Sequence, residues 1–147
     1  MSDESVEILL VEDSPDDVAF FVRTFNKTNL AARVHVVADG KEALEFVFCT
    51  GSHSARNLAN RPKVIFLDMK MPKVDGMEVL RRLKADPYTR TIPIVALSSS
   101  NEERDLIESY RHGVNSYIVK PMDFDQFAET VRVISQYWLQ FNKTPKP

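Results

Sequence analysis

The sequence predicts an α/β fold in which helices cover both faces of a central parallel sheet, the doubly wound arrangement, and three observations support it. Val64-Ile65-Phe66-Leu67 is an apolar run without alternation, which is typical of a strand buried on both faces. A second run, at residues 8–11, has the same character. Both runs end in acidic residues and are followed by helical patterns, as expected when parallel strands alternate with helices.

Three further segments are predicted as strands. Residues 33–37 mix polar and apolar side chains, as a strand at the edge of a sheet should. Residues 92–97 carry Pro93 near the strand start, where a proline is tolerated. In chain order the strands are predicted at residues 8–11, 33–37, 64–67, 92–97 and 116–119.

Each predicted strand is followed by a capping pattern that marks the start of a helix. A serine or aspartate stands first, and an acid or amide follows three residues later, so that side chains can accept hydrogen bonds from the free N–H groups of the first turn. The agreement of all these patterns supports the register. The pairs are Ser14 and Asp17, Asp39 and Glu42, Asp75 and Glu78, Ser100 and Glu103, and Asp123 and Gln126.

The spacing of apolar residues predicts which helical faces pack inward. In the fourth helix, Leu106, Ile107 and Tyr110 are expected to face the core. The single cysteine, Cys49, lies in an apolar helical pattern and is predicted to be a small core residue rather than a nucleophile. The last helix is predicted to bury Phe124, Phe127, Ala128, Val131, Ile134, Trp138 and Phe141.

Length and composition narrow the function classes. The 147 residues are predicted to form one domain, residues 1–142, with a disordered tail at 143–147. Lysine and arginine number 19 against 21 acidic residues, and no basic stretch lies beside aromatics, which argues against direct nucleic-acid binding. No glycine-rich nucleotide motif, leader or membrane-length apolar run is present, so we expect a cytoplasmic protein.

Polar side chains follow four of the five predicted strands: Glu12 and Asp13, then Asp68, Ser98 and Lys120. Because the carboxyl ends of parallel strands meet at one edge, these groups should converge. Their excess negative charge predicts a divalent cation, and Mg²⁺ suits an all-oxygen site. The set predicts phosphoryl transfer to Asp68, with Lys120 and Ser98 contacting the phosphoryl oxygens.

Each of these residues also has an ordinary structural explanation. Glu12 and Asp13 could simply be acidic residues near the positive end of a helix. Lys120 could be a surface lysine, and Ser98 could be the start of a loop. Their joint placement after the strands is not predicted by these explanations, and it therefore favours a functional site.

The chain resembles the receiver domain of two-component response regulators. The resemblance implies the flavodoxin-like fold, with five helices around a five-stranded sheet in the order 2-1-3-4-5. It also implies a phosphoacceptor signalling protein, not an enzyme, that assists its own phosphorylation and dephosphorylation. The matching residues are Glu12-Asp13, Leu67-Asp68-Met69-Lys70-Met71-Pro72, Asp75-Gly76, Ser98, Tyr117 and Lys120-Pro121.

The resemblance implies a role for each matching residue. Asp68 would accept a phosphoryl group from a histidine kinase. Ser98 and Tyr117 would form a switch pair that remodels the surface of the fourth helix, fifth strand and fifth helix; Ser98 replaces the commoner threonine but keeps the hydroxyl. The implied Mg²⁺ ligands are Glu12, Asp13, Asp68 and the backbone carbonyl of Lys70.

Two details of the motif carry further expectations. Lys70 lies two residues after the phosphoacceptor, where side chains of this family modulate dephosphorylation, so we expect it to set the lifetime of the phosphate rather than the rate of its formation. The Lys120-Pro121 peptide bond is expected to be cis, although only about one X–Pro bond in twenty is cis in folded proteins.

Within the family, the chain is most similar to the stand-alone regulators paired with phytochrome histidine kinases. This similarity rests on the long segment before the third strand and on three further stretches of sequence. These stretches are Ser109-Tyr110, Val114-Asn115-Ser116-Tyr117 and Gln136-Tyr137-Trp138-Leu139. It implies a phytochrome kinase as partner and a homodimer formed through the C-terminal helix by Trp138, Leu139 and Phe141. The alternative is that the ring of Trp138 folds back onto its own domain.

Two other functions remain open on the sequence. An aspartyl-phosphate phosphatase of the haloacid-dehalogenase type also places aspartate and lysine on a parallel sheet. That class has a second acid two residues after its nucleophile, where this chain has Lys70. A receiver that binds partners without being phosphorylated is the other alternative, although no expected site residue is missing.

Overall fold

A five-stranded parallel sheet in the order β2-β1-β3-β4-β5 forms the centre of the computed structural model, which describes residues 6–71 and 73–145. This architecture confirms the predicted fold class. The strands are β1 (Ile8–Val11), β2 (Val34–Val37), β3 (Val64–Asp68), β4 (Ile94–Ser98) and β5 (Ser116–Val119). The helices are α1 (Pro15–Asn26), α2 (Gly40–Phe48), α3 (Gly76–Ala85), α4 (Glu103–Arg111) and α5 (Phe124–Gln136).

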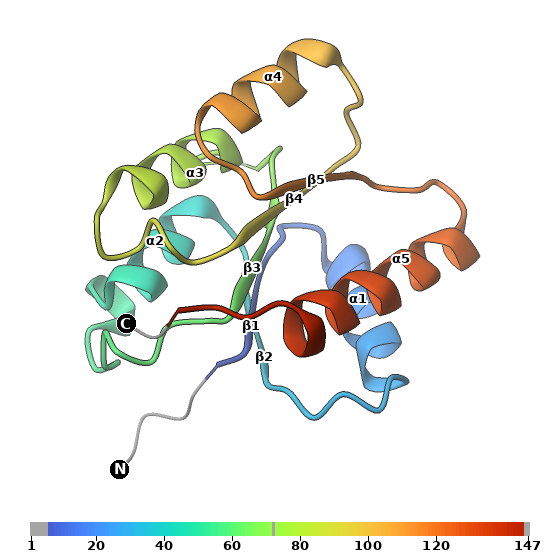
Figure 1. Cartoon of the computed structure of the whole chain (residues 1–147), viewed down its shortest axis with the longest axis horizontal. Coiled ribbons are helices and arrows are strands. Elements are labelled where there is room, and N and C mark those ends of the chain that lie inside the picture. The colour runs from blue at the N-terminus through green and yellow to red at the C-terminus, as the bar shows by residue number, and fades with distance from the viewer. Residues whose placement is uncertain (1–5, 72, 146–147) are drawn as a thin grey trace.

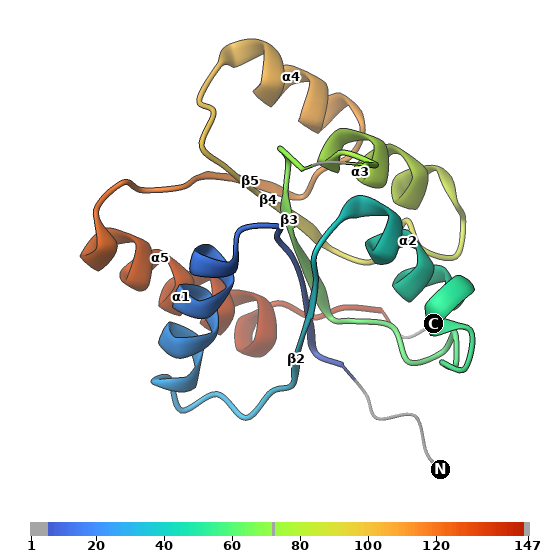
Figure 2. The same ribbon diagram turned by 180° about the vertical axis from the view of Figure 1, so that it is seen from behind.

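Helices α1 and α5 cover one face of the sheet, and α2, α3 and α4 lie on the other (Figures 1 and 2). The central strands supply two separate cores because alternate side chains of a strand point to opposite faces. In β1, Ile8 and Leu10 pack towards α1 and α5, whereas Leu9 and Val11 pack towards α2 and α3. All four side chains are buried, as the unbroken apolar pattern predicted.

Four of the five predicted helix caps are confirmed, and the cap of α4 was predicted wrongly. The side chains of Ser14, Asp39, Asp75 and Asp123 each accept a hydrogen bond from the N–H three residues on. Helix α4 instead has Glu102 at its N-cap and no side-chain cap. Ser100 cannot serve because its hydroxyl accepts from the N–H of Glu102 and donates to the Asp105 carboxylate, 2.6 Å away.

The inward face of α4 was also predicted wrongly. Ile107 and Tyr110 are 43% and 54% exposed, and Leu106 is half-buried. The buried residue of this helix is the small Ser109. Helix α4 thus buries a small polar residue and presents Ile107 and Tyr110 to solvent.

Helix α5 follows its predicted stripe only in the middle. Phe127, Val131 and Ile134 are buried. Phe124 and Phe141, at the two ends of the stripe, are exposed, although the ring centroid of Phe124 lies 5.4 Å from that of Phe20 in α1. A π-helical turn, Tyr137–Phe141, continues the helix.

Two local expectations are corrected. Cys49 is not within α2: it is the half-buried C-cap, in the left-handed conformation with φ 57°, because the chain leaves the helix there. The described residues contain no cis peptide bond, so Lys120-Pro121 has the trans form, the lower-energy isomer.

Residues 143–145 have no regular secondary structure, and 146–147 lie outside the described residues; the domain boundary and the disordered tail stay predictions.

The loop after β3 is closely packed from two sides by glycines. A Cβ atom on Gly76 would lie 2.5 Å from the carbonyl oxygen of Asp68, and one on Gly40 would lie 1.8 Å from the carbonyl oxygen of Val74. Both distances are too short for any side chain. The two glycines therefore allow α2 and α3 to close on the loop that follows Asp68.

No helix in the described residues is long and apolar enough to cross a membrane.

Candidate functional site

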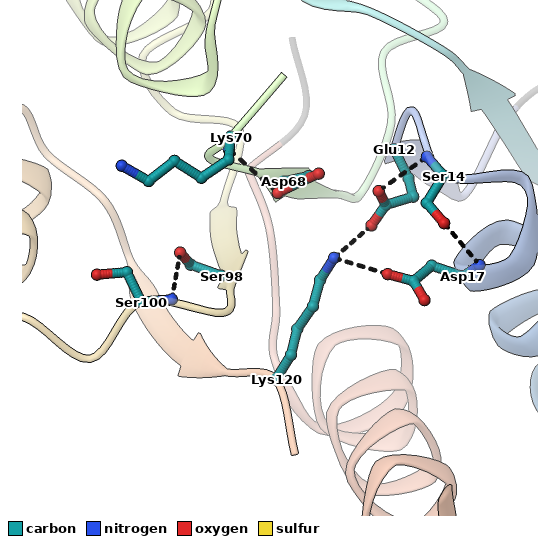
Figure 3. A network of polar contacts seen from close by, with 8 residues as sticks. All are labelled: Glu12, Ser14, Asp17, Asp68, Lys70, Ser98, Ser100 and Lys120. Carbon is teal, nitrogen blue, oxygen red and sulfur yellow. Dashed lines mark hydrogen bonds and ion pairs between the residues drawn. The ribbon is translucent and has the colours of Figure 1, made fainter. Parts of the chain in front are cut away.

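The carboxyl ends of β1, β3, β4 and β5 bring Glu12, Asp68, Ser98 and Lys120 to one edge of the sheet, as the sequence predicted (Figure 3). Glu12 and Asp68 are 4% and 6% exposed, whereas the neighbouring Asp13 is exposed. Carboxylate oxygens of these three acids lie within 4.8 Å of one another. Such a set of oxygen ligands is suited to a divalent cation.

Lys120 lies between two carboxylates on the α1 side of this cluster. Its Nζ donates to Glu12 Oε1 at 2.6 Å and to Asp17 Oδ2 at 3.1 Å (Figure 3). Burial alone would lower the pKa of Lys120, but hydrogen bonds to Glu12 and Asp17 and the charge of Asp68 outweigh it and raise the pKa above its usual value. Lys120 is therefore a cation at neutral pH.

Asp68 is the member of the cluster whose charged form is disfavoured by its surroundings. Burial, followed by the hydrogen bond and the charge of Glu12, raises the pKa of Asp68 to about 7, against the smaller opposing effects of Lys120 and of the Lys70 backbone. The Lys70 N–H donates to Asp68 Oδ1 at 3.1 Å. Two buried acids with one lysine leave negative charge that a cation would neutralise.

Ser98 and Tyr117 meet at the loop between β4 and α4. The buried Ser98 hydroxyl accepts from the N–H of Ser100 at 3.1 Å, and the Tyr117 hydroxyl donates to the Ser100 carbonyl at 2.9 Å. Beside them lies a cavity of about 490 Å³, lined in part by Met69, Met77, Ser98 and Tyr117. The predicted switch pair thus shares one loop residue and borders open space.

Three polar residues that the sequence analysis did not assign to the site belong to it. Asp17 was identified only as a cap partner, although its side chain reaches Lys120. Ser100 and Asp105 connect the site to α4, and Lys70 Nζ lies 3.9 Å from Asp105 Oδ2. Asp17 and Asp105 are acidic residues in the first turns of helices that follow strands of the site. This position is the feature of the sequence that could have assigned them to the site.

Comparisons with known proteins agree with this geometry. The family profile described as response regulator receiver domain matches residues 8–132. The probable methanogenesis regulatory protein FilR2 of Methanothrix harundinacea is 38% identical over 140 residues, which cover 95% of this chain and 88% of FilR2. Response regulator Rcp1 of Synechocystis is 35% identical over 143 residues, which cover 95% of both chains.

Two solved structures are also similar. The phosphorylated cyanobacterial phytochrome response regulator RcpA is 35% identical, with a TM-score of 0.89 over 97% of this chain and 100% of its own. The Mn²⁺-bound form of Rcp1 is 33% identical, with a TM-score of 0.88 over 95% of this chain and 99% of its own.

Asp68→Asn is expected to stabilise the metal-free protein at pH values above the pKa of Asp68. The pKa of Asp68 is about 7 in the folded protein, whereas the ordinary aspartate pKa of 3.8 applies to the unfolded chain. Folding therefore binds a proton between these values, and wild-type stability falls as the pH rises through this window; asparagine removes that loss. We expect a gain in unfolding free energy on the order of 2 kcal/mol at about pH 8, and less at about pH 5, by urea denaturation with a chelator.

Mg²⁺ provides the control for this measurement. If it binds the acidic cluster of the folded state, it should stabilise the wild type at alkaline pH and stabilise Asp68→Asn much less. Equal stability of the two metal-free proteins at alkaline pH would contradict the raised pKa of Asp68.

Proposed function

Since this chain belongs to the family of response regulator receiver domains, we propose that Asp68 accepts a phosphoryl group from a histidine kinase in a Mg²⁺-dependent reaction. The observation that carries the proposal is the burial of Asp68 among Glu12, Asp13 and Lys120 at the carboxyl edge of the sheet. A phosphatase of the haloacid-dehalogenase type is not favoured, because the basic Lys70 stands where that class has its second acid.

The reaction forms one bond and breaks another at phosphorus. A carboxylate oxygen of Asp68 attacks the phosphorus of phosphohistidine, a P–O bond forms, and the P–N bond breaks to release the imidazole. Glu12, Asp13, Asp68 and the carbonyl of Lys70 would hold Mg²⁺, which when bound neutralises charge on the carboxylates and the phosphoryl group. The ammonium of Lys120 and the hydroxyl of Ser98 then contact phosphoryl oxygens.

Phosphorylation would be transmitted through the loop that Ser98 and Tyr117 share. A Ser98 hydroxyl that turns to the phosphoryl group gives up its hydrogen bond with the Ser100 N–H. Tyr117, whose hydroxyl is hydrogen-bonded to the carbonyl of Ser100, can then turn towards the adjacent cavity. The surface that changes contains exposed Ile107, Tyr110 and Val119, and a downstream protein would recognise it there.

We propose a phytochrome histidine kinase as the partner. The support is the likeness to the phytochrome response regulator RcpA along nearly the whole of both chains. The chain would then act in a phosphorelay that starts from red light, in the cytoplasm, and pass the signal through protein contacts rather than by binding nucleic acid directly.

We also propose a homodimer through the C-terminal helix, but two of the three residues that form it differ from those predicted. Trp138 and Leu139 pack against the core of their own domain, which is the alternative arrangement considered for Trp138. Towards the C-terminal end of this helix, Val133, Tyr137 and Phe141 are 46%, 47% and 67% exposed. Their spacing of four residues places them on one side of the helix. Of the three residues predicted for the interface from the sequence, Phe141 is retained.

Incubation with a small phosphodonor and Mg²⁺ should add one phosphoryl group to the wild type and none to Asp68→Asn, because only the carboxylate can attack phosphorus. Intact-protein mass spectrometry measures the adduct. Asp75→Asn, which changes an exposed acid at the helix α3 cap, should still be labelled. A wild type without adduct, tested with kinase as well as donor, would contradict the proposed function.

Lys70→Asn should change the lifetime of the aspartyl phosphate severalfold and leave its rate of formation within about twofold. The side chain of Lys70 is 65% exposed, with its Nζ 3.9 Å from Asp105 Oδ2, and the residue lies two positions after the phosphoacceptor Asp68. Decay of the purified phosphoprotein, followed by mass spectrometry, measures the lifetime. Equal lifetimes for the two proteins would contradict this role.

Phe141→Glu should weaken self-association at least about tenfold, because a charge replaces an apolar contact at the proposed interface. Sedimentation equilibrium measures the dissociation constant. Met122→Glu is the matched control: it introduces the same charge at an exposed methionine on the loop before α5. A dimer weakened equally by both substitutions would argue against an interface formed by Val133, Tyr137 and Phe141.

A further inference from the structure

We propose that Asp17 is a positioning residue that holds Lys120 away from Asp68 in the unphosphorylated protein and so slows phosphorylation without slowing hydrolysis. The inference rests on the proposed function, because it concerns how Lys120 reaches the phosphoryl group on Asp68. Asp17 has no part in the roles assigned above.

The hydrogen bonds of Lys120 show where its charge is held. Nζ donates to Glu12 at 2.6 Å and to Asp17 at 3.1 Å, so the ammonium is turned towards α1 (Figure 3). Within the described part of the chain, Asp68 is not among its ion-pair partners. To contact a phosphoryl oxygen on Asp68, Lys120 must therefore leave at least one carboxylate.

Asp17 differs from Glu12 in what happens to its charge when the site is loaded. Glu12 is in the acidic cluster with Asp13 and Asp68, and a bound cation would offset its attraction for Lys120. Asp17 lies outside that cluster, and its side chain is 38% exposed. Asp17 is thus the carboxylate that keeps its full attraction for Lys120 in the presence of the cation.

The position of Asp17 is more specific than the helix start requires. Asp16 and Asp17 both lie in the first turn of α1, where an acid interacts favourably with the helix dipole. Asp16 satisfies that preference while exposed to solvent. Asp17 in addition contacts a lysine from the end of β5, 103 residues away in the sequence.

The kinetic consequence is asymmetric. The Asp17 to Lys120 pair stabilises the unphosphorylated protein, from which phosphorylation starts. The proposal requires that this pair be broken in the phosphoprotein, from which hydrolysis starts, because the ammonium of Lys120 then contacts the phosphoryl group instead of Asp17. Removing the Asp17 charge should therefore speed phosphorylation by about two- to fivefold, the size expected for a partly exposed ion pair, and leave the hydrolysis rate unchanged.

Asp17→Asn and Asp16→Asn form a matched pair, because each removes one negative charge from the same helical turn. Rates of labelling by acetyl phosphate at saturating Mg²⁺, and rates of decay, would be measured for both and for the wild type. We expect faster labelling for Asp17→Asn alone and equal decay for all three proteins. Beryllofluoride, a phosphoryl analogue, should also bind Asp17→Asn more tightly by a similar factor in a calorimetric titration, which is a readout independent of phosphoryl transfer.

A double-mutant cycle tests whether Asp17 acts through Lys120. In a Lys120→Met background, Asp17→Asn should no longer change the labelling rate. Equal rates for Asp17→Asn and Asp16→Asn, or an effect that persists without Lys120, would overturn the inference while the wild type is still labelled. A wild type that is never labelled would overturn the proposed function itself.

Discussion

The burial of two carboxylates beside a single lysine is the constraint on which the rest of the structure depends. Glu12 and Asp68 are almost inaccessible to solvent, and burial, followed by the hydrogen bond and the charge of Glu12, raises the pKa of Asp68 to about 7. Such a cluster is unfavourable unless the surrounding fold stabilises it. The unfavourable charge is also what makes the site ready for a cation and a phosphoryl group.

The stabilising fold comes from strands that are buried on both faces. Alternate residues of β1 and β3 fill two cores, so the ends of these strands are fixed relative to each other. The pairing of Val11 with Leu67 then places Glu12 directly beside Asp68, at the next position along each strand. On the other side of β3, Asp68 pairs with Leu97, which brings Ser98 to the same edge.

The sequence predicted the parts of this arrangement that depend on repeating patterns. Unbroken apolar runs identified the strands, and the acids that follow them identified the site, because parallel strands end at a common edge. The orientation of α4 was not predictable in this way, since Ile107 and Tyr110 are exposed and a serine is the buried residue. Asp17 was missed because its partner, Lys120, comes from a distant strand and only the tertiary structure joins them.

The uneven packing also explains where a conformational change can occur. Around Glu12 and Asp68, a movement of β1 or β3 would disrupt a filled core on each side of the sheet. Helix α4 is held instead by the small Ser109 and by hydrogen bonds of Ser100 beside a cavity. Regions with few buried apolar contacts rearrange at low cost. We therefore expect a charge change at the rigid strand ends to move α4 and its loop, where Ile107 and Tyr110 are exposed.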